Sequence, residues 1–268
     1  MAVKFLNKAT MPASNLVLSD SAVSATTGSP TTATYTSGGI NYKTYSFTGS
    51  GSITLSTAGL VDVLAIASGG GGSNAVWAPA GGGGFFGQNN SYYLPASAHT
   101  ITIGGGGGIN ASGNPTSLGI YAGTSYLIAL GGGGGGSGNP GTGLRGANGG
   151  GGSGDYTVGL AGGVTLLTDF GFNGGESGNQ AGGGGGGATA NGGGGGAVTF
   201  RVGGNGGAGK ASTFATGSSV NYAGGGLGYG QAGNGTAGAG GGGTANTGGG
   251  GNFNTAGGSG LVVIRVKA

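Results

Sequence analysis

A glycine-rich stretch that ends in a lysine is the strongest candidate for chemistry in this sequence. Residues 204–211 read Gly-Asn-Gly-Gly-Ala-Gly-Lys-Ala, which has the glycine and lysine spacing of a phosphate-binding loop. That motif also needs a serine or threonine hydroxyl after the lysine to hold Mg²⁺, and Ala211 stands there instead. Because 81 of the 268 residues are glycine, such spacings arise readily from composition alone. We therefore expect no nucleotide binding.

The other reactive side chains are few and scattered along the chain. There is no cysteine, so thiol nucleophiles and cysteine-zinc sites are excluded. The only histidine, His99, begins an alternating strand, where an ordinary polar residue is the simpler interpretation. The five acidic residues occur singly, without the pairing that metal binding or glycosidase chemistry requires: Asp20, Asp62, Asp155, Asp169 and Glu176. The sequence predicts a protein that is not an enzyme and has no cofactor and no metal.

Aromatic residues between the glycine runs are the remaining candidates for binding. The densest group lies in the stretch 73–94, where aromatic rings are combined with amide side chains. One interpretation is that these rings fill a core and compensate for the glycines. The other is that some lie on loop tips, because aromatic anchors suit binding surfaces. The predicted receptor-binding residues are Trp77, Phe85, Phe86, Asn89, Tyr92 and Tyr93.

Charge and hydropathy exclude two classes of partner. The formal net charge is +3, but the eight basic residues are spread singly along the chain. Phosphate binding needs a clustered basic face, so we expect no nucleic-acid partner. No apolar stretch approaches the 18 residues of a membrane span, and the first 20 residues lack the apolar core of a signal peptide. We therefore expect no membrane insertion.

The composition favours an ordered glycine architecture over a flexible coil. Disordered chains are usually polar and highly charged, with few aromatic residues. Here 35% of the residues are hydrophobic, only 5% are charged and 20 are aromatic. Glycine loses more backbone freedom on folding than any other residue. An ordered chain with so many glycines therefore needs close approach of backbone to backbone.

Two regions differ in character. Residues 1–39 are rich in Ser, Thr and Ala, and we interpret them as a separate attachment segment. Residues 40–268 form the glycine-rich domain. In it, the alternation around 45–55 predicts a β-hairpin, and the apolar run 60–67 predicts a strand buried on both faces. Further strands are predicted at 99–103, 121–130, 163–167, 198–202 and 261–266.

The pure glycine runs between these strands suit one backbone geometry. A helix of the polyproline II type turns once in three residues and rises about 3.1 Å per residue, without internal hydrogen bonds. Polyglycine helices of this kind can hydrogen-bond to one another sideways when no side chain separates them. Flexible linkers are the alternative, but linkers usually mix other polar residues into the glycines. The predicted fold is all-β, with a small β-sandwich at 40–67, 99–103 and 261–266 that supports packed polyglycine II-like helices and loops, and with essentially no α-helix.

Four segments resemble a known family, and three of them carry the resemblance to its opening and closing strands. These are Tyr-Ser-Phe-Thr-Gly-Ser-Gly-Ser-Ile-Thr-Leu at 45–55, Val-Asp-Val-Leu-Ala-Ile-Ala-Ser followed by four glycines at 61–72, and Gly-Leu-Val-Val-Ile-Arg-Val at 260–266. They resemble the opening and closing strands of the glycine-rich domain of bacteriophage tail-fibre and adhesin structural proteins. His99 to Gly108 resembles the second strand of that domain. The resemblance covers residues 40–268 and is specific at the two ends of this region.

This resemblance implies a function without chemistry. In the related distal adhesins of T-even-like phages, a sandwich of polyglycine helices carries variable loops that bind the host surface. The chain is thus expected in the virion, assembled in the bacterial cytoplasm, as a tail-fibre or adhesin component. Its expected partners are other phage structural proteins through residues 1–39, and a host surface polysaccharide or outer-membrane protein. A homotrimer is an open alternative to a single copy. A head-decoration or head-fibre protein bound to the capsid is the alternative function.

Overall fold

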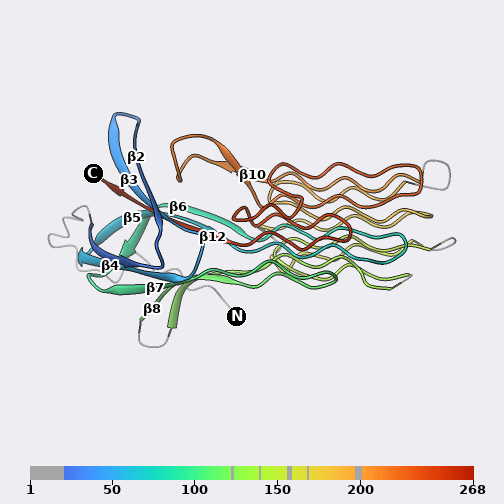
Figure 1. Cartoon of the computed structure of the whole chain (residues 1–268), viewed down its shortest axis with the longest axis horizontal. Helices are drawn as coiled ribbons and strands as arrows, with labels where there is room; N and C mark the ends of the chain where they lie inside the picture. Colours follow the sequence, from blue (N-terminus) through green and yellow to red (C-terminus); the bar gives the residue numbers. More distant parts are fainter. Residues whose placement is uncertain (1–20, 122–123, 139, 156–158, 168, 197–200) are drawn as a thin grey trace.

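The chain separates into β-sheets at one end and extended glycine-rich segments at the other (Figure 1). The computed structural model describes residues 21–121, 124–138, 140–155, 159–167, 169–196 and 201–268. These residues contain no helix, and their strands pair in an antiparallel manner, so the predicted all-β fold is confirmed. We call the described residues of the glycine-rich segments 68–85, 103–115, 130–209 and 223–260 the glycine array.

The strands form two five-stranded sheets and one separate hairpin. The first sheet has the order β1(Ala22–Thr27), β4(Gly51–Thr57), β7(Ala98–Thr102), β8(Thr116–Tyr121) and β9(Thr124–Ala129). The second has the order β2(Thr31–Ser37), β3(Ile40–Phe47), β12(Leu261–Lys267), β5(Gly59–Ile66) and β6(Phe86–Leu94). The hairpin joins β10(Lys210–Ser212) to β11(Val220–Tyr222).

Both sheets contribute to one hydrophobic core. Phe47 of β3 and Ile264 of β12 come from the second sheet, and Ile53, Ile101 and Leu118 come from the first. All five side chains are fully buried. The inward-facing residues of each strand alternate with outward-facing ones, as the two-residue period of a strand requires. The shared core therefore holds the two sheets together.

The central strands β5 and β12 are buried on both faces. Val63 of β5 and Val262 of β12 face the shared core. Their neighbours Leu64 and Val263 face the opposite way, into a second cluster that includes Phe214 and Tyr222 from the segment carrying the β10–β11 hairpin. A strand buried on both faces has no place for alternating polar residues. The strands predicted at 60–67 and 261–266 are confirmed as β5 and β12.

One arginine links strands that are distant in the sequence. Arg265 of β12 lies opposite Asp62 of β5, and its Nη2 and Nε are 2.7 Å and 2.9 Å from Asp62 Oδ2. Its Nη1 donates to the Tyr35 hydroxyl at 3.1 Å, and the guanidinium lies about 4 Å from the ring centres of Tyr42 and Phe214. Burial acts to lower the pKa of Arg265, but its bonds to Tyr35 and Asp62 more than offset this and raise it. The side chain therefore stays charged.

Segment 80–85 shows how the glycine array is held together. Its first and fourth N–H groups donate to segment 183–186, the second and fifth to 248–251, and the third and sixth to 130–133, with N···O distances of 2.8–3.1 Å. Return to the same neighbour at every third residue indicates the three-residue turn of a polyproline II-type helix. Carbonyl groups of the same segment accept from further segments, through the N–H groups of Gly70, Gly151 and Gly226. The expected ordered packing of the glycine runs is thus confirmed.

This packing leaves no room for side chains at most of the glycines in the array. A Cβ atom at Gly133 would overlap the carbonyl oxygen of Leu144, and one at Gly184 would overlap that of Asn205. Backbone of this kind cannot move away without breaking hydrogen bonds of its own. Most of the glycines are therefore required by contact between backbones, and only a few, such as Gly242 and Gly243, have positive φ angles.

The predicted hairpin at 45–55 is wrong. Strands β3 and β4 do follow one another, but β3 pairs with β2 and β12 in the second sheet, whereas β4 pairs with β1 and β7 in the first. Residues 48–50 pass from one sheet to the other. Alternation predicts which side of a strand is buried, but it does not identify the neighbouring strand. Two strands on opposite sides of a shared core show the same pattern as a hairpin.

Other predicted strands had mixed outcomes. The strand at 99–103 is β7, and that at 121–130 is largely β9, preceded by β8. The strand predicted at 163–167 is wrong, because this segment follows the glycine array and makes only an isolated bridge from Thr165 to Gly146. Of the strand predicted at 198–202, residues 198–200 lie outside the described residues.

Much of the presumed attachment segment belongs to the sheets. Residues 22–27 are β1, an edge strand of the first sheet, and residues 31–37 are β2, an edge strand of the second. The boundary expected after residue 39 falls within the turn between β2 and β3. Residues 1–20 lie outside the described residues.

A matched pair of alanine substitutions tests the packing of the array. Gly133→Ala should lower the free energy of unfolding by at least about 2 kcal/mol, because the new methyl group meets fixed backbone. At Gly105 the nearest atom to an added Cβ is Asn114 Nδ2, 3.9 Å away. Gly105→Ala should therefore change stability by no more than about 0.5 kcal/mol. Equal effects in urea-induced unfolding would contradict the packed array.

A double-mutant cycle tests the buried ion pair. Asp62→Leu should cost about 3 kcal/mol, because it leaves the charge of Arg265 buried without its partner. Arg265→Met combined with Asp62→Leu should cost clearly less than the two single changes together. Thermal and denaturant unfolding give the four stabilities. Additive losses would show that the two side chains act independently.

Candidate functional site

The end of the glycine array that lies away from the sheets is formed by loops. We call the surface made of loops 74–79, 109–111, 230–233 and 252–255 the loop end; loops 74–79 and 230–233 lie at the far end of the array in Figure 1, and loops 109–111 and 252–255 turn somewhat nearer the sheets. Its loops come from distant parts of the sequence, and the glycine segments bring them together. Two apolar side chains point outward there: Val76 is 61% exposed and Ile109 is 42% exposed. The loop end therefore combines solvent-facing apolar groups with a rigid support.

An aromatic cluster packs beneath these loops. The rings of Trp77 and Tyr229 stack with 6.3 Å between their centres and 16° between their planes. Phe253 meets Tyr229 edge-on at 5.2 Å. Trp77 is only 6% exposed, so its ring packs against other loops instead of facing solvent. The cluster fixes three loops relative to one another and contributes beyond its buried area through the stacked and edge-on geometries.

Hydrogen bonds also join the loops. Asn110 Nδ2 donates to Asn74 Oδ1 at 2.8 Å, and the Asn254 N–H donates to the Ser73 carbonyl at 2.8 Å. Arg201 Nη1 donates to Gln231 Oε1 at 2.6 Å. These bonds cross between loops that are far apart in the chain. The loop end is therefore a preorganised surface, which reduces the ordering cost of binding.

The six predicted receptor-binding residues do not form a single site. Trp77 lies at the loop end, whereas Phe85 to Tyr93 lie beyond the return segment 81–84, at the sheets (Figure 1). Four residues in this geometry span about 12 Å. Phe85 is half-buried and meets Phe170 edge-on, with 6.4 Å between the ring centres.

The remaining predicted residues belong to the edge strand β6. Phe86 is half-buried and packs against the second hydrophobic cluster, with Lys210 Nζ 5.2 Å from its ring centre. Asn89 is exposed and accepts the Ser91 N–H through its Oδ1 at 2.9 Å. Tyr92 packs against the shared core, and Tyr93 is 43% exposed. Only part of this group therefore faces solvent.

Asparagines outside the predicted binding residues hold neighbouring segments of the array together. Each accepts a backbone N–H from a neighbouring segment through its side-chain oxygen, as Asn148 does from Phe172, Asn173 from Thr165 and Asn191 from Asn173, all at 2.9 Å. The side-chain amide thus replaces a missing backbone carbonyl. A signal was present, because Asn-Gly-Gly recurs at 148–150, 173–175, 191–193 and 205–207.

The residues that first suggested chemistry have structural contacts. His99 is buried, with Nε2 2.9 Å from the Pro95 carbonyl and 3.3 Å from Ser97 Oγ. Lys210 opens strand β10, not a helix.

Within the described ranges, no three His, Cys, Asp or Glu residues group together as metal ligands. The same part of the chain contains no helix long and apolar enough to cross a membrane. Burial raises the pKa of Tyr222, which packs in the second cluster.

These features define an all-β protein in which sheets support a hydrogen-bonded array of glycine segments, with loops at its far end. A sequence profile of the glycine-rich domain matches residues 46–267. The chain belongs to the glycine-rich domain family. No curated protein matches it.

A pair of substitutions separates packing from exposure at the loop end. Trp77→Ala should lower the free energy of unfolding by about 3 kcal/mol, because it removes a buried ring from the aromatic cluster. Val76→Ala, one residue away but exposed, should change it by less than about 0.5 kcal/mol. Calorimetry of the two variants provides the measurement. Similar melting temperatures would mean that the Trp77 ring is not part of the packing.

Proposed function

We propose that this chain is a structural protein of a bacteriophage virion, a tail-fibre or adhesin component that binds the host cell surface through its loop end. The observation that carries the proposal is the preorganised loop end, with Val76 and Ile109 exposed over a buried aromatic cluster. Preorganised surfaces with central apolar anchors suit binding to a protein or polysaccharide. The resemblance of residues 40–268 to phage glycine-rich domains supports the virion context.

The positions of the sheets and the loops at opposite ends of the molecule fit this proposal. Strands β1 and β2 are edge strands at the sheet end, opposite the loops. Edge strands present unpaired N–H and C=O groups that can pair with another chain. We propose that residues 1–39 attach the protein to other phage structural proteins, as one copy or as a homotrimer. The loop end then faces outward, toward a surface polysaccharide or an outer-membrane protein.

A head-decoration or head-fibre protein bound to the capsid is the second candidate. The same glycine-rich domain would serve there, and the two functions differ in location and copy number. Quantitative mass spectrometry of purified particles distinguishes them, since a fibre component occurs in tens of copies and a decoration protein in hundreds. Labelled antibody on the tail or on the capsid gives the location directly.

Charge substitutions test the binding surface. Val76→Asp and Ile109→Asp should each reduce binding of the purified, labelled protein to host cells about tenfold, because loss of a central apolar contact costs more than about 1 kcal/mol. Ile40→Asp is the matched control, since Ile40 is also exposed but lies at the sheet end. Equal binding by all three variants, each with an unchanged melting temperature, would contradict a receptor contact at the loop end.

A further inference from the structure

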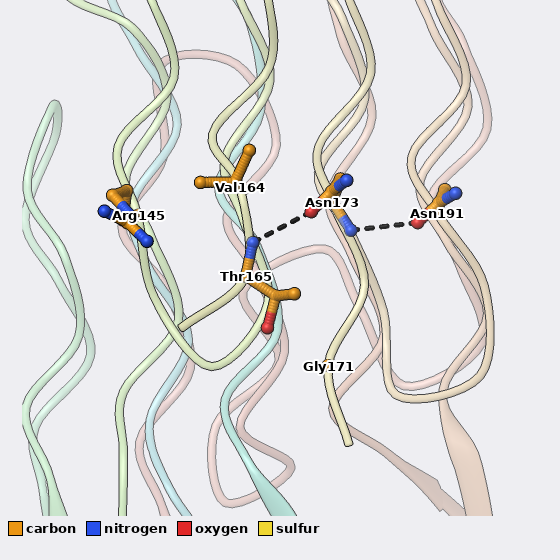
Figure 2. A pocket seen from close by; sticks show the side chains of 6 residues that line it. All are labelled: Arg145, Val164, Thr165, Gly171, Asn173 and Asn191. Atoms are coloured by element: carbon orange, nitrogen blue, oxygen red, sulfur yellow. Dashed lines mark hydrogen bonds between the residues drawn. The ribbon is translucent and has the colours of Figure 1, made fainter. Parts of the chain in front are cut away.

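The flank of the glycine array carries an open groove away from the loop end. Figure 2 shows this groove, which has a volume of about 450 Å³ and is lined by Arg145, Val164, Thr165, Gly171, Asn173 and Asn191. It lies near the sheets, because the Ala147 N–H donates to Gly131, two residues beyond the end of β9. Four different segments of the array contribute to it. The groove is therefore separate from the surface proposed to contact the host.

The hydrogen-bond acceptors of the groove are already engaged. Asn173 Oδ1 accepts the Thr165 N–H, and Asn191 Oδ1 accepts the Asn173 N–H, both at 2.9 Å (Figure 2). The Thr165 hydroxyl donates to the Ala147 carbonyl at 2.7 Å. These bonds fix the orientation of both amides. In the part of the chain that the structure describes, neither Nδ2 group makes a hydrogen bond.

The groove is rich in donors and carries a positive charge. The exposed Arg145 makes no ion pair with any described carboxylate, and no carboxylate is among the described lining residues. A guanidinium presents a planar fork of N–H donors that matches a carboxylate or phosphate. Together with the two amide NH₂ groups, it favours a ligand that supplies acceptors and negative charge.

The remaining lining residues indicate the shape of the ligand. Val164 is 46% exposed and offers an apolar surface. Gly171 forms part of the wall without a side chain, and a Cβ there would overlap the Thr165 hydroxyl. A single cation among neutral amides does not suit nucleic acid, which needs a run of cations. The lining of the groove instead suits a ligand that has one negative group, many hydroxyl groups and an apolar C–H face that can contact Val164.

We propose that this groove binds an acidic sugar residue of a glycan. Arg145 pairs with the carboxylate or phosphate of this sugar and Val164 packs against its C–H face, while the Nδ2 groups of Asn173 and Asn191, on the next two segments, donate to ring and hydroxyl oxygens of this sugar and of the one that follows it in the glycan (Figure 2). This inference goes beyond the loop-end function, since it concerns a different surface and would hold whichever virion component the protein is.

An array of bacterial surface oligosaccharides tests the inference. It carries uronate-bearing, phosphate-bearing and neutral glycans, and the full chain is applied to it. We expect binding to acidic glycans over neutral ones, and the uronate and phosphate members distinguish the two sources of charge. The best glycan is then titrated by calorimetry. Absence of binding to any acidic glycan, or equal binding to neutral glycans, overturns the proposal.

Three variants locate the contact. Arg145→Gln should weaken binding at least about tenfold, because it removes a charge-assisted hydrogen bond. Asn191→Asp keeps the side-chain acceptor for Asn173 but replaces the donor with a negative charge, so it should also weaken binding at least about tenfold. Lys43→Gln is the control, with the same change in net charge at an exposed position outside the groove.

The outcomes separate this inference from the loop-end function. Equal losses in Arg145→Gln and Lys43→Gln, or no loss in either groove variant, overturn the groove as the binding site. Circular dichroism and melting temperatures confirm that each variant is folded. Val76→Asp should leave glycan binding in the groove unchanged. Loss of host-cell binding in Val76→Asp, without any acidic-glycan binding by the unmodified chain, would overturn the groove and leave the loop-end function standing.

Discussion

The structure depends on one constraint, which is that neighbouring backbones must approach closely enough to hydrogen-bond sideways in three directions. Each segment of the array turns once in three residues, so its N–H groups reach a different neighbour at each step and return to the first at the fourth. A β-carbon at most of these positions would overlap a neighbouring carbonyl. Glycine, a weakening residue inside helices and strands, is here the residue that allows cohesion. The interior of the array is accordingly held by backbone polar groups and contains few side chains.

The sheets supply what the array lacks. The array buries little apolar surface, whereas the two sheets share a core of large side chains such as Phe47, Ile53 and Ile264. Strands β5, β7, β9 and β11 lead into the array, and β6, β8, β10 and β12 receive the chain from it. The pair formed by Arg265 and Asp62 joins the two strands that carry the first and last glycine segments. Hydrophobic burial thus fixes the segments that adjoin strands, and lateral hydrogen bonds hold the inner segments, such as 182–187, against them.

A strand could be predicted from the sequence where its burial on both faces requires a run of apolar residues. Strand β5 is covered on both faces, and the apolar run 60–67 predicted this, whereas for 261–266 the sequence predicted only a strand. Pairing was not predictable in the same way, because alternation at 45–55 reports a buried face and not a neighbour. The residues predicted as one binding site lie in two places. Trp77 and Phe85 are close in sequence, but the extended glycine segment between them places one at the loop end and the other at the sheets. Asn173 and Asn191 were not predicted, because each side-chain oxygen accepts an N–H group from a neighbouring segment, and the sequence alone does not show which segments are neighbours.

The three-residue period has a consequence for the length of the chain. A segment of pure glycine that slides along its axis by three residues regains all of its lateral bonds, since every glycine is equivalent. Pure glycine therefore does not determine its own register. Asparagines, serines and loop side chains must therefore set the register of each segment against its neighbours. Asn148 does this through its hydrogen bonds with Phe172, Gly83 and Gly84. Insertions or deletions in multiples of three glycines preserve the phase, whereas those of one or two break it. Related chains should differ in the lengths of their glycine runs by threes.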